Sequence, residues 1–152
     1  MLLSNSCEYG LRALLYLSAE EGEGYVSLRE ISKRLDISFA FLGKIFQSLN
    51  ESELTTSRRG PSGGVALARD PTTITLYEVV VALDGEELFT ECVLGLPGCG
   101  EQEPCPLHQS WAQQRDQLEL LFRRATLAET AQETKEQNYR LTSGTIAGDG
   151  LT

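Results

Sequence analysis

The sequence predicts a mainly α-helical fold with one small β-hairpin, followed by a long C-terminal helix. Apolar residues recur at three- and four-residue spacing in several segments of the 152-residue chain, which is the period of a helix with one buried face. Three of these segments begin with a short polar residue and a glutamate three positions later, as in a capping box. A glycine-rich loop between two short predicted strands indicates the hairpin.

The first three helices are expected at residues 5–19, 28–35 and 39–51. Asn5 with Glu8 and Ser27 with Glu30 are the pairs expected to cap the first two helices. The third helix carries an i, i+3, i+4, i+7 apolar set, made of Leu42, Ile45, Phe46 and Leu49. A turn at 36–38 joins it to the second helix, so the pair is a helix-turn-helix candidate.

A basic hairpin is expected directly after these helices. Its strands are predicted at 54–57 and 65–68, and the loop 58–64 between them contains two arginines and three glycines. A helix-turn-helix followed by such a hairpin is a winged helix. Thr75 with Glu78 then begins a helix at 76–83. Residues 1–83 are therefore predicted to form a winged helix-turn-helix DNA-binding domain.

The C-terminal half is expected to hold a functional loop and a dimerisation helix. Residues 84–106 contain three cysteines among glycines and prolines, and a connection of this length is usually functional or disordered. The segment 107–130 carries a helix with Trp111 and Phe122 near one face. We expect these two side chains to be buried against a partner chain, so the segment is the predicted dimerisation helix. Residues 131–152 show no apolar period and are expected to be disordered.

Composition and charge exclude several classes of protein. The chain has 22 acidic and 13 basic residues and a net charge of −9, which excludes adhesion to nucleic acid through the whole surface. Residues 1–70 are nearly balanced, with eight basic and nine acidic residues, and can concentrate their cations on one face. No apolar run approaches the ~18 residues that cross a bilayer, and no signal-peptide pattern is present, so a cytoplasmic protein is expected. A single histidine and no Cys-x-x-Cys pair argue against an enzyme.

The helix at 39–51 has a face suited to DNA. A rotation of about 100° per residue places Ala40, Lys44 and Gln47 opposite the buried stripe. In a major groove, Lys44 and Gln47 would offer hydrogen bonds to base edges, and Ala40 with the edge of Phe41 would meet a thymine methyl. The hairpin residues Arg58, Arg59 and Gly60 suit a narrow minor groove. A solvated helix face and a soluble hairpin tip are the alternatives that these residues leave open.

Cys92, Cys99 and Cys105 lie within fourteen positions, and His108 follows Cys105 after two residues. Thiolates suit zinc or an iron–sulfur cluster, and in a reducing compartment such a group more often holds a metal than a disulfide. Separations of six and five residues lack the Cys-x-x-Cys pair of structural zinc sites. The spacing favours an iron–sulfur cluster and leaves zinc as the alternative. Cys7 is expected to be a small buried apolar residue.

Several segments together resemble one family. The stretch from Glu8 to Leu17, the stretch 37–45, the loop 59–64 and the three cysteines are similar to the bacterial iron–sulfur winged-helix transcriptional regulators. The resemblance covers about residues 1–128. It implies a homodimer whose long C-terminal helices cross at the interface, and a [2Fe–2S] cluster held by the three cysteines. It also implies that Arg59 is the wing arginine and that the following residues face DNA: Ser38, Ala40, Phe41, Gly43 and Lys44.

The resemblance leaves the fourth cluster ligand open. His108 matches a histidine ligand of the iron–sulfur-cluster regulators, and Glu8 matches a carboxylate that the partner chain donates in the nitric-oxide-sensitive members. We expect His108, with the partner's Glu8 as the alternative. The predicted function is a homodimeric DNA-binding regulator that senses redox state, iron or nitric oxide. The alternatives are a winged-helix regulator with structural zinc or no metal, and a protein-interaction adaptor.

Overall fold

The computed structural model describes residues 2–20, 24–98 and 100–143. An antiparallel hairpin of β1 (Thr55–Arg58) and β2 (Gly64–Leu67) and a short 3₁₀ turn, η1 (Pro71–Thr73), separate α3 (Phe39–Glu51) from α4 (Leu76–Asp84). The helices are α1 (Asn5–Ala19), α2 (Leu28–Leu35), α3 (Phe39–Glu51), α4 (Leu76–Asp84), α5 (Glu87–Thr90), α6 (His108–Arg124) and α7 (Leu127–Glu136). The predicted mainly α-helical fold with a hairpin wing is confirmed.

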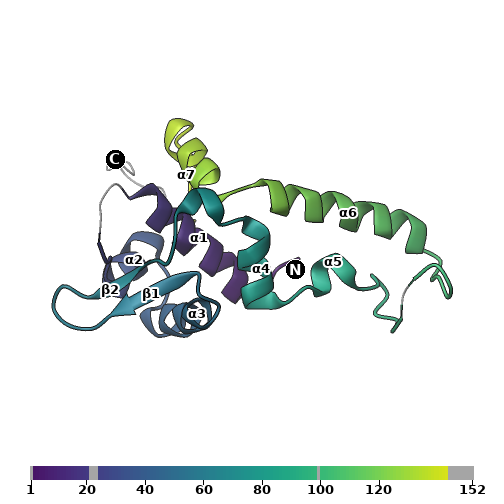
Figure 1. Cartoon of the computed structure of the whole chain (residues 1–152), viewed down its shortest axis with the longest axis horizontal. Helices are drawn as coiled ribbons and strands as arrows, with labels where there is room; N and C mark the ends of the chain where they lie inside the picture. Colours follow the sequence, from purple (N-terminus) through teal and green to yellow (C-terminus); the bar gives the residue numbers. More distant parts are fainter. Residues whose placement is uncertain (1, 21–23, 99, 144–152) are drawn as a thin grey trace.

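Figure 1 shows two parts, which we call the body and the arm. The body (residues 4–20, 24–84 and 127–143) contains α1–α4, the hairpin and α7, and the arm (residues 85–98 and 100–124) contains α5, α6 and the cysteine loop between them. Nothing in the described part of the chain forms a helix with the length and apolar character of a membrane span.

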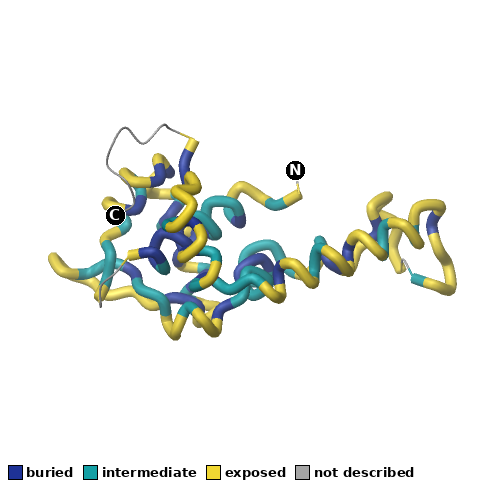
Figure 2. Tube along the Cα trace, turned by 90° about the horizontal axis from the view of Figure 1, so that it is seen from above, coloured by how far each residue is buried: buried dark blue, intermediate teal, exposed yellow. Residues whose placement is uncertain are grey.

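The body is organised around α1. Its buried residues pack with those of α2, α3 and α4 in one hydrophobic core, and Figure 2 shows the buried positions concentrated there. Gly10 lies where α1 approaches its neighbours closely, since a Cβ at this position would stand 2.4 Å from Leu83 Cδ1 and 3.3 Å from Ile45 Cγ2. The largest fully buried core side chains include Leu14, Tyr16, Ile31, Leu42, Phe46, Leu49, Ile74 and Val79.

Polar caps begin most of the helices, with one difference from the expected pairs. The capping box of Thr75 and Glu78 is present, and the Ser27 hydroxyl accepts from the Glu30 backbone N–H. The expected pair of Asn5 and Glu8 is wrong, because Ser4 caps α1 by accepting from the Cys7 N–H at 3.1 Å. Ser4 is held in this place because its own N–H donates to Asp84, at the end of α4, at 2.9 Å.

The wing is fastened to the segment before α2. Val26 forms an isolated bridge with Val65, in which each backbone N–H donates to the other carbonyl at 2.9 Å. Gly64 has a φ of +147°, and a Cβ there would lie 2.1 Å from the Val26 carbonyl oxygen. Only glycine fits at this close approach.

The prediction that residues 131–152 are disordered is wrong for the part that the structure describes. Helix α7 continues to Glu136, and Leu127, Ala131 and Leu141 belong to the core of the body. The signal was missed because α7 buries a narrow strip of mostly small side chains, and one of them, Thr134, is polar. The predicted dimerisation segment 107–130 is also divided, since α6 ends at Arg124 and Thr126 caps α7. Residues 144–152 lie outside the described residues.

The segment that runs from α4 through the arm begins and ends at neighbouring positions in the fold. Thr75 and Thr126 form an isolated antiparallel bridge, with the Leu76 N–H donating to Ala125 O and the Leu127 N–H to Ile74 O, both at 2.9 Å. The base of the arm is joined to the body by a second apolar cluster. Its buried members are Cys7 of α1, Val80 of α4, Phe89 of α5 and Phe122 of α6.

Candidate DNA-facing surface and cysteine loop

The structure places the predicted face of α3 at the surface. Ala40, Lys44 and Gln47 are exposed, and the Gln47 amide lies 3.5 Å from Glu51, one turn further along. Ser38 is the exposed N-cap of α3 and accepts from the Phe41 N–H. The tight turn before it depends on Asp36, which adopts the left-handed conformation with a φ of 54°. The residues that helical rotation places opposite the buried stripe therefore share one accessible face.

Phe41 and Gly43 differ from the rest of that face. The Phe41 ring is half-buried and meets the Tyr9 ring of α1 edge-on, with 5.6 Å between centroids. This side chain is therefore engaged in holding α3 against α1. Gly43 is also half-buried, and nothing lies within 4 Å of where its Cβ would be. The open space beside Gly43 lets a large partner approach the helix backbone.

The two wing arginines have different environments. Arg58 lies over the Tyr25 ring, with its guanidinium carbon 4.7 Å from the centroid. Arg59 and Gly60 are exposed at the hairpin end, where Gly60 has a φ of +108°. Arg59 forms no ion pair with any residue in the described ranges. The Arg58 side chain is therefore oriented by Tyr25, whereas the exposed Arg59 side chain can adjust its position to a bound ligand.

Sequence reasoning did not single out Phe39 and Arg29. Phe39 is the first residue of α3 and is 49% exposed, and the guanidinium carbon of Arg29 lies 5.3 Å from its ring centroid. The position of an aromatic residue at the start of α3, outside its buried stripe, could have indicated that Phe39 belongs to the accessible face. These two residues extend the accessible face from α3 to α2.

The cysteine loop brings two of its predicted ligands together. Cys92 and Cys105 are 7% and 9% exposed, and their Sγ atoms lie 3.5 Å apart. Two sulfur ligands on one tetrahedral metal with bonds of ~2.3 Å would be about 3.8 Å apart, so this pair fits a metal–thiolate site. Cys99 lies outside the described residues. Within the ranges that the structure describes, no group of three or more metal-binding side chains is assembled.

The two candidates for a fourth ligand lie in different elements. His108 is the first residue of α6, and its backbone N–H donates to the Cys105 carbonyl at 3.0 Å. Glu8 lies on α1 and is half-buried, and the structure does not gather it with the two described cysteines. Cys7 is fully buried, and burial, followed by the charges of Asp84 and Glu8, raises its pKa to about 12. Cys7 thus occupies an apolar environment that disfavours the thiolate.

Helix α6 fixes the start of the cysteine loop. The Trp111 indole N–H donates to the Glu91 carbonyl at 2.8 Å. The Arg115 guanidinium donates to the carbonyls of Thr90 and Glu91 at 2.6 and 2.9 Å. The peptide directly before Cys92 is therefore held from the helix that begins after the loop. Arg115 was missed from the sequence because a lone arginine in a polar helix gives no sign of burial.

Comparison with known proteins gives consistent matches over most of the chain. A family model described as Rrf2, Iron-dependent Transcriptional regulator, matches residues 3–133. The transcriptional regulator IscR of Sodalis glossinidius is 35% identical over 129 residues, covering 85% of this chain and 78% of that protein. IscR of Escherichia coli is 33% identical over 129 residues, with coverages of 85% and 79%.

Two solved structures share the fold. CymR, the global cysteine regulator of B. subtilis, has a TM-score of 0.73 at 26% identity, covering 87% of this chain and 97% of that chain. T. potens IscR has a TM-score of 0.72 at 26% identity and covers 89% of each chain. The curated relatives are transcriptional regulators, which confirms the expectation against an enzyme.

Proposed function

The chain belongs to the Rrf2 family of transcriptional regulators, and from that premise we propose that it is a cytoplasmic homodimer that binds DNA and senses redox state, iron or nitric oxide through a [2Fe–2S] cluster. The observation that carries the sensing part is the pair of buried cysteines, Cys92 and Cys105, with their sulfur atoms 3.5 Å apart. They come from the two ends of one loop, at the tip of the arm in Figure 1.

In the proposed complex, α3 enters the major groove of duplex DNA. Lys44 and Gln47 offer donors to base edges, and Ala40 faces a thymine methyl. Gly43 lets the groove wall come close, and Ser38 donates to a phosphate. Phe41 acts by holding α3 against Tyr9. Because Ala40 and Gly43 offer no hydrogen bonds, we expect phosphate contacts and DNA shape to contribute much of the affinity.

The wing takes the neighbouring minor groove in this proposal. Arg59 inserts into it, because an arginine suits the negative potential of a narrow minor groove. Arg58 stays on Tyr25 and orients the hairpin. Gly60 gives the tip the positive φ that its turn requires.

Cys92, Cys99 and Cys105 are the proposed protein ligands of the cluster, with His108 as the fourth and the partner's Glu8 as the alternative. When bound, the cluster would supply an iron centre whose charge changes on oxidation or reduction and that reacts with nitric oxide. A non-thiolate fourth ligand raises the reduction potential. Trp111 and Arg115 hold the peptide before Cys92, and His108 begins α6. Both ends of the cysteine loop are thus connected to α6. Binding of a cluster by the loop would therefore act on this helix from both ends.

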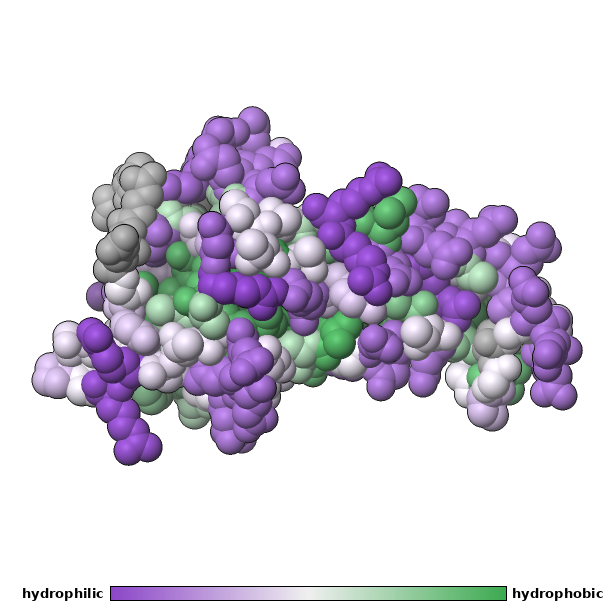
Figure 3. All heavy atoms as spheres, in the orientation of Figure 1, coloured by the Kyte–Doolittle hydropathy of each residue, from purple (hydrophilic) through white to green (hydrophobic). Residues whose placement is uncertain are grey.

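The arm offers the surface for a second copy of the chain. Leu120 and Leu121 of α6 are 39% and 58% exposed, and Leu107 is exposed at the start of the same helix. Figure 3 shows apolar residues reaching the surface along the arm. A dimer with two-fold symmetry presents two recognition helices to half-sites about 34 Å apart. A change in the arm that alters this separation weakens DNA binding.

The test of the cluster is anaerobic purification of the full chain, followed by visible absorption and iron analysis. We expect a coloured protein that loses its absorption in Cys92→Ala, Cys99→Ala and Cys105→Ala. Cys7→Ala is the matched control and keeps the absorption, because Cys7 lies in an apolar cluster. A colourless protein with stoichiometric zinc would support the zinc site, and one with neither metal after reconstitution would overturn the proposal.

The test of DNA binding compares two lysines at matched salt. Lys44→Ala is expected to weaken binding of a selected operator fragment about tenfold, since a good base contact contributes about 1–3 kcal/mol. Lys135→Ala on α7 is the control and keeps the wild-type affinity. Equal affinities of Lys44→Ala and wild type would contradict the placement of α3. Failure of the wild type to retain any DNA at low salt would favour the protein-interaction adaptor.

The fourth ligand is tested by the reduction potential. His108→Cys is expected to lower the potential of the cluster, because thiolate replaces a non-thiolate ligand. Glu8→Gln leaves it unchanged if His108 is the ligand. The reverse result would assign the position to the partner's Glu8.

A further inference from the structure

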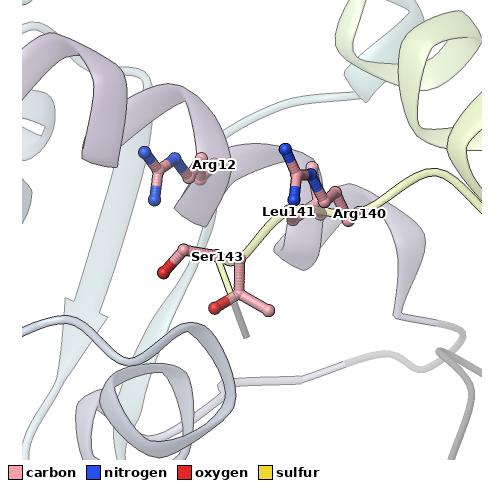
Figure 4. Close-up of a pocket in the computed structure, with 5 residues that line it drawn as sticks. Arg12, Arg140, Leu141 and Ser143 are labelled. Carbon is pink, nitrogen blue, oxygen red and sulfur yellow. The ribbon is translucent and has the colours of Figure 1, made fainter. Parts of the chain in front are cut away.

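A pocket of about 220 Å³ lies on the body between α1 and the segment that follows α7. Figure 4 shows Arg12 on α1 on one side of it, and Arg140, Leu141 and Ser143 on the C-terminal segment. Thr142 completes the lining. The polar residues that line this pocket are therefore two arginines, a threonine and a serine, with no carboxylate among the described lining residues.

The positive charge of the pocket is not neutralised within the described residues. The ion pairs found there are Arg69 with Glu78 and Arg123 with Glu119, and neither involves Arg12 or Arg140. Two like charges that line one pocket repel each other, and an anion between them removes that repulsion. The arrangement favours a ligand that carries negative charge.

The volume and the donors define the class of ligand. A pocket of about 220 Å³ is smaller than the ~300 Å³ of the smallest pockets for drug-sized molecules, so it suits a compact ligand. Each guanidinium can bind a carboxylate or phosphate in a bidentate manner. Two guanidinium groups match two negative charges, and the Ser143 hydroxyl adds a donor at the same wall.

Arg12 also connects this pocket with the recognition helix. Its guanidinium carbon lies 5.1 Å from the centroid of the Tyr9 ring, one turn earlier in α1. The Tyr9 ring in turn packs edge-on against Phe41 of α3 at 5.6 Å. A ligand that draws the Arg12 guanidinium into the pocket changes the cation–π contact with Tyr9, and Tyr9 is in direct contact with α3.

We propose that this pocket binds a small dianion, phosphate or a short dicarboxylate, between Arg12 and Arg140, and that its occupancy is communicated to α3 through Tyr9 and Phe41. The binding part does not rest on the cluster or on DNA recognition. The consequence for DNA affinity rests on the proposed role of α3.

Binding is tested by isothermal titration of the full chain with sodium phosphate and, separately, with sodium succinate at constant ionic strength. We expect saturable binding at one site per chain for one of the two probes, which identifies the source of the charge. Arg12→Gln and Arg140→Gln each weaken this binding at least tenfold. Arg124→Gln, at the exposed end of α6, is the matched control and binds like the wild type. Since Arg140 is exposed, its variant keeps the fold even if Arg12→Gln does not.

The coupling is tested with and without the probe that binds. The affinity for the operator fragment is expected to change at least threefold at saturation in the wild type. In Tyr9→Leu this change disappears while the probe still binds. Aromatic NMR resonances of Phe41 give a readout without DNA, and they shift on titration in the wild type only.

Three results would overturn the inference. Absence of saturable binding of both probes removes the site, and equal weakening in Arg124→Gln shows nonspecific attraction. A wild type whose Phe41 resonances and DNA affinity ignore the bound probe removes the coupling. Loss of DNA binding with normal titration and normal Phe41 shifts would count against the proposed function and leave the pocket supported.

Discussion

In the body, side chains from α1, α2, α3, α4 and α7 bury against one another in one continuous core, whereas the arm has only a small apolar cluster at its base. Beyond that cluster, the arm is held by the polar contacts of Trp111 and Arg115. Several of its leucines stay exposed. The body is therefore stabilised by its own burial, whereas the arm has few buried apolar contacts and keeps apolar surface exposed.

The largest expected effect is in the core of the body. Phe46→Ala removes a ring that is 1% exposed, and a buried Phe→Ala change typically costs about 3–5 kcal/mol. Urea denaturation should give an unfolding free energy lower by this amount. A loss below about 1 kcal/mol would contradict the view that the body depends on close packing.

A smaller loss is expected where the arm depends on polar contacts. Arg115→Met keeps the apolar stem and removes the bonds to the carbonyls of Thr90 and Glu91. Hydrogen bonds from charged groups contribute about 1.5–3 kcal/mol, so hydrogen exchange at α5 should accelerate accordingly. Arg124→Met, at an exposed position of the same helix, is the control. Equal protection of α5 in both variants would show that the arm is held in another way.

The exposed leucines of the arm should matter for association and hardly at all for folding. Leu121→Ala changes a side chain that is 58% exposed, and surface changes usually alter stability by less than about 0.5 kcal/mol. If α6 forms the dimer interface, the dimer dissociation constant rises about tenfold, because burying a leucine contributes about 1.5–3 kcal/mol. Analytical ultracentrifugation measures both species. An unchanged dissociation constant would place the interface elsewhere.

The smallest expected effect is a pH dependence at the joint between the two parts. Burial raises the pKa of Cys7 from 9.0 to about 12, so the neutral thiol stabilises the fold below pH 9. This contribution is lost as pH rises from 9 towards 12. The stability of the wild type relative to Cys7→Ala should fall by about 1 kcal/mol between pH 9 and pH 10. Parallel pH profiles of the two proteins would indicate that Cys7 meets solvent.

The sequence predicted the parts of the body whose pattern is local. The helices 28–35 and 39–51 carry strong apolar periods, and the loop 58–64 has a clear glycine signature. Helix α7 was missed because its contact with α1 is made by small side chains such as Ala131 and Thr134. The Ser4 cap was missed because it depends on Asp84, eighty residues away. Local patterns do not encode contacts of that kind.

The candidate site divides in the same way. The exposed face of α3 follows from helical rotation alone, so the exposure of Lys44 and Gln47 was predicted correctly. The engagement of Phe41 with Tyr9 requires the packing of two helices and was not foreseen. Phe122 was assigned to a partner chain, and in the structure it is buried beside Phe89 of the same chain. Only the tertiary structure distinguishes an apolar residue that is buried within its own chain from one that is buried against a partner.

The bridge between Thr75 and Thr126 joins the two ends of the segment that contains α4, α5 and α6. The apolar cluster of Cys7, Val80, Phe89 and Phe122 connects the same segment to α1 at a second place. Beside the bridge, the Ile74 and Leu127 side chains are fully enclosed in the core of the body. The base of the arm is thus anchored at two separate points, which restricts hinge motion of the arm relative to α1.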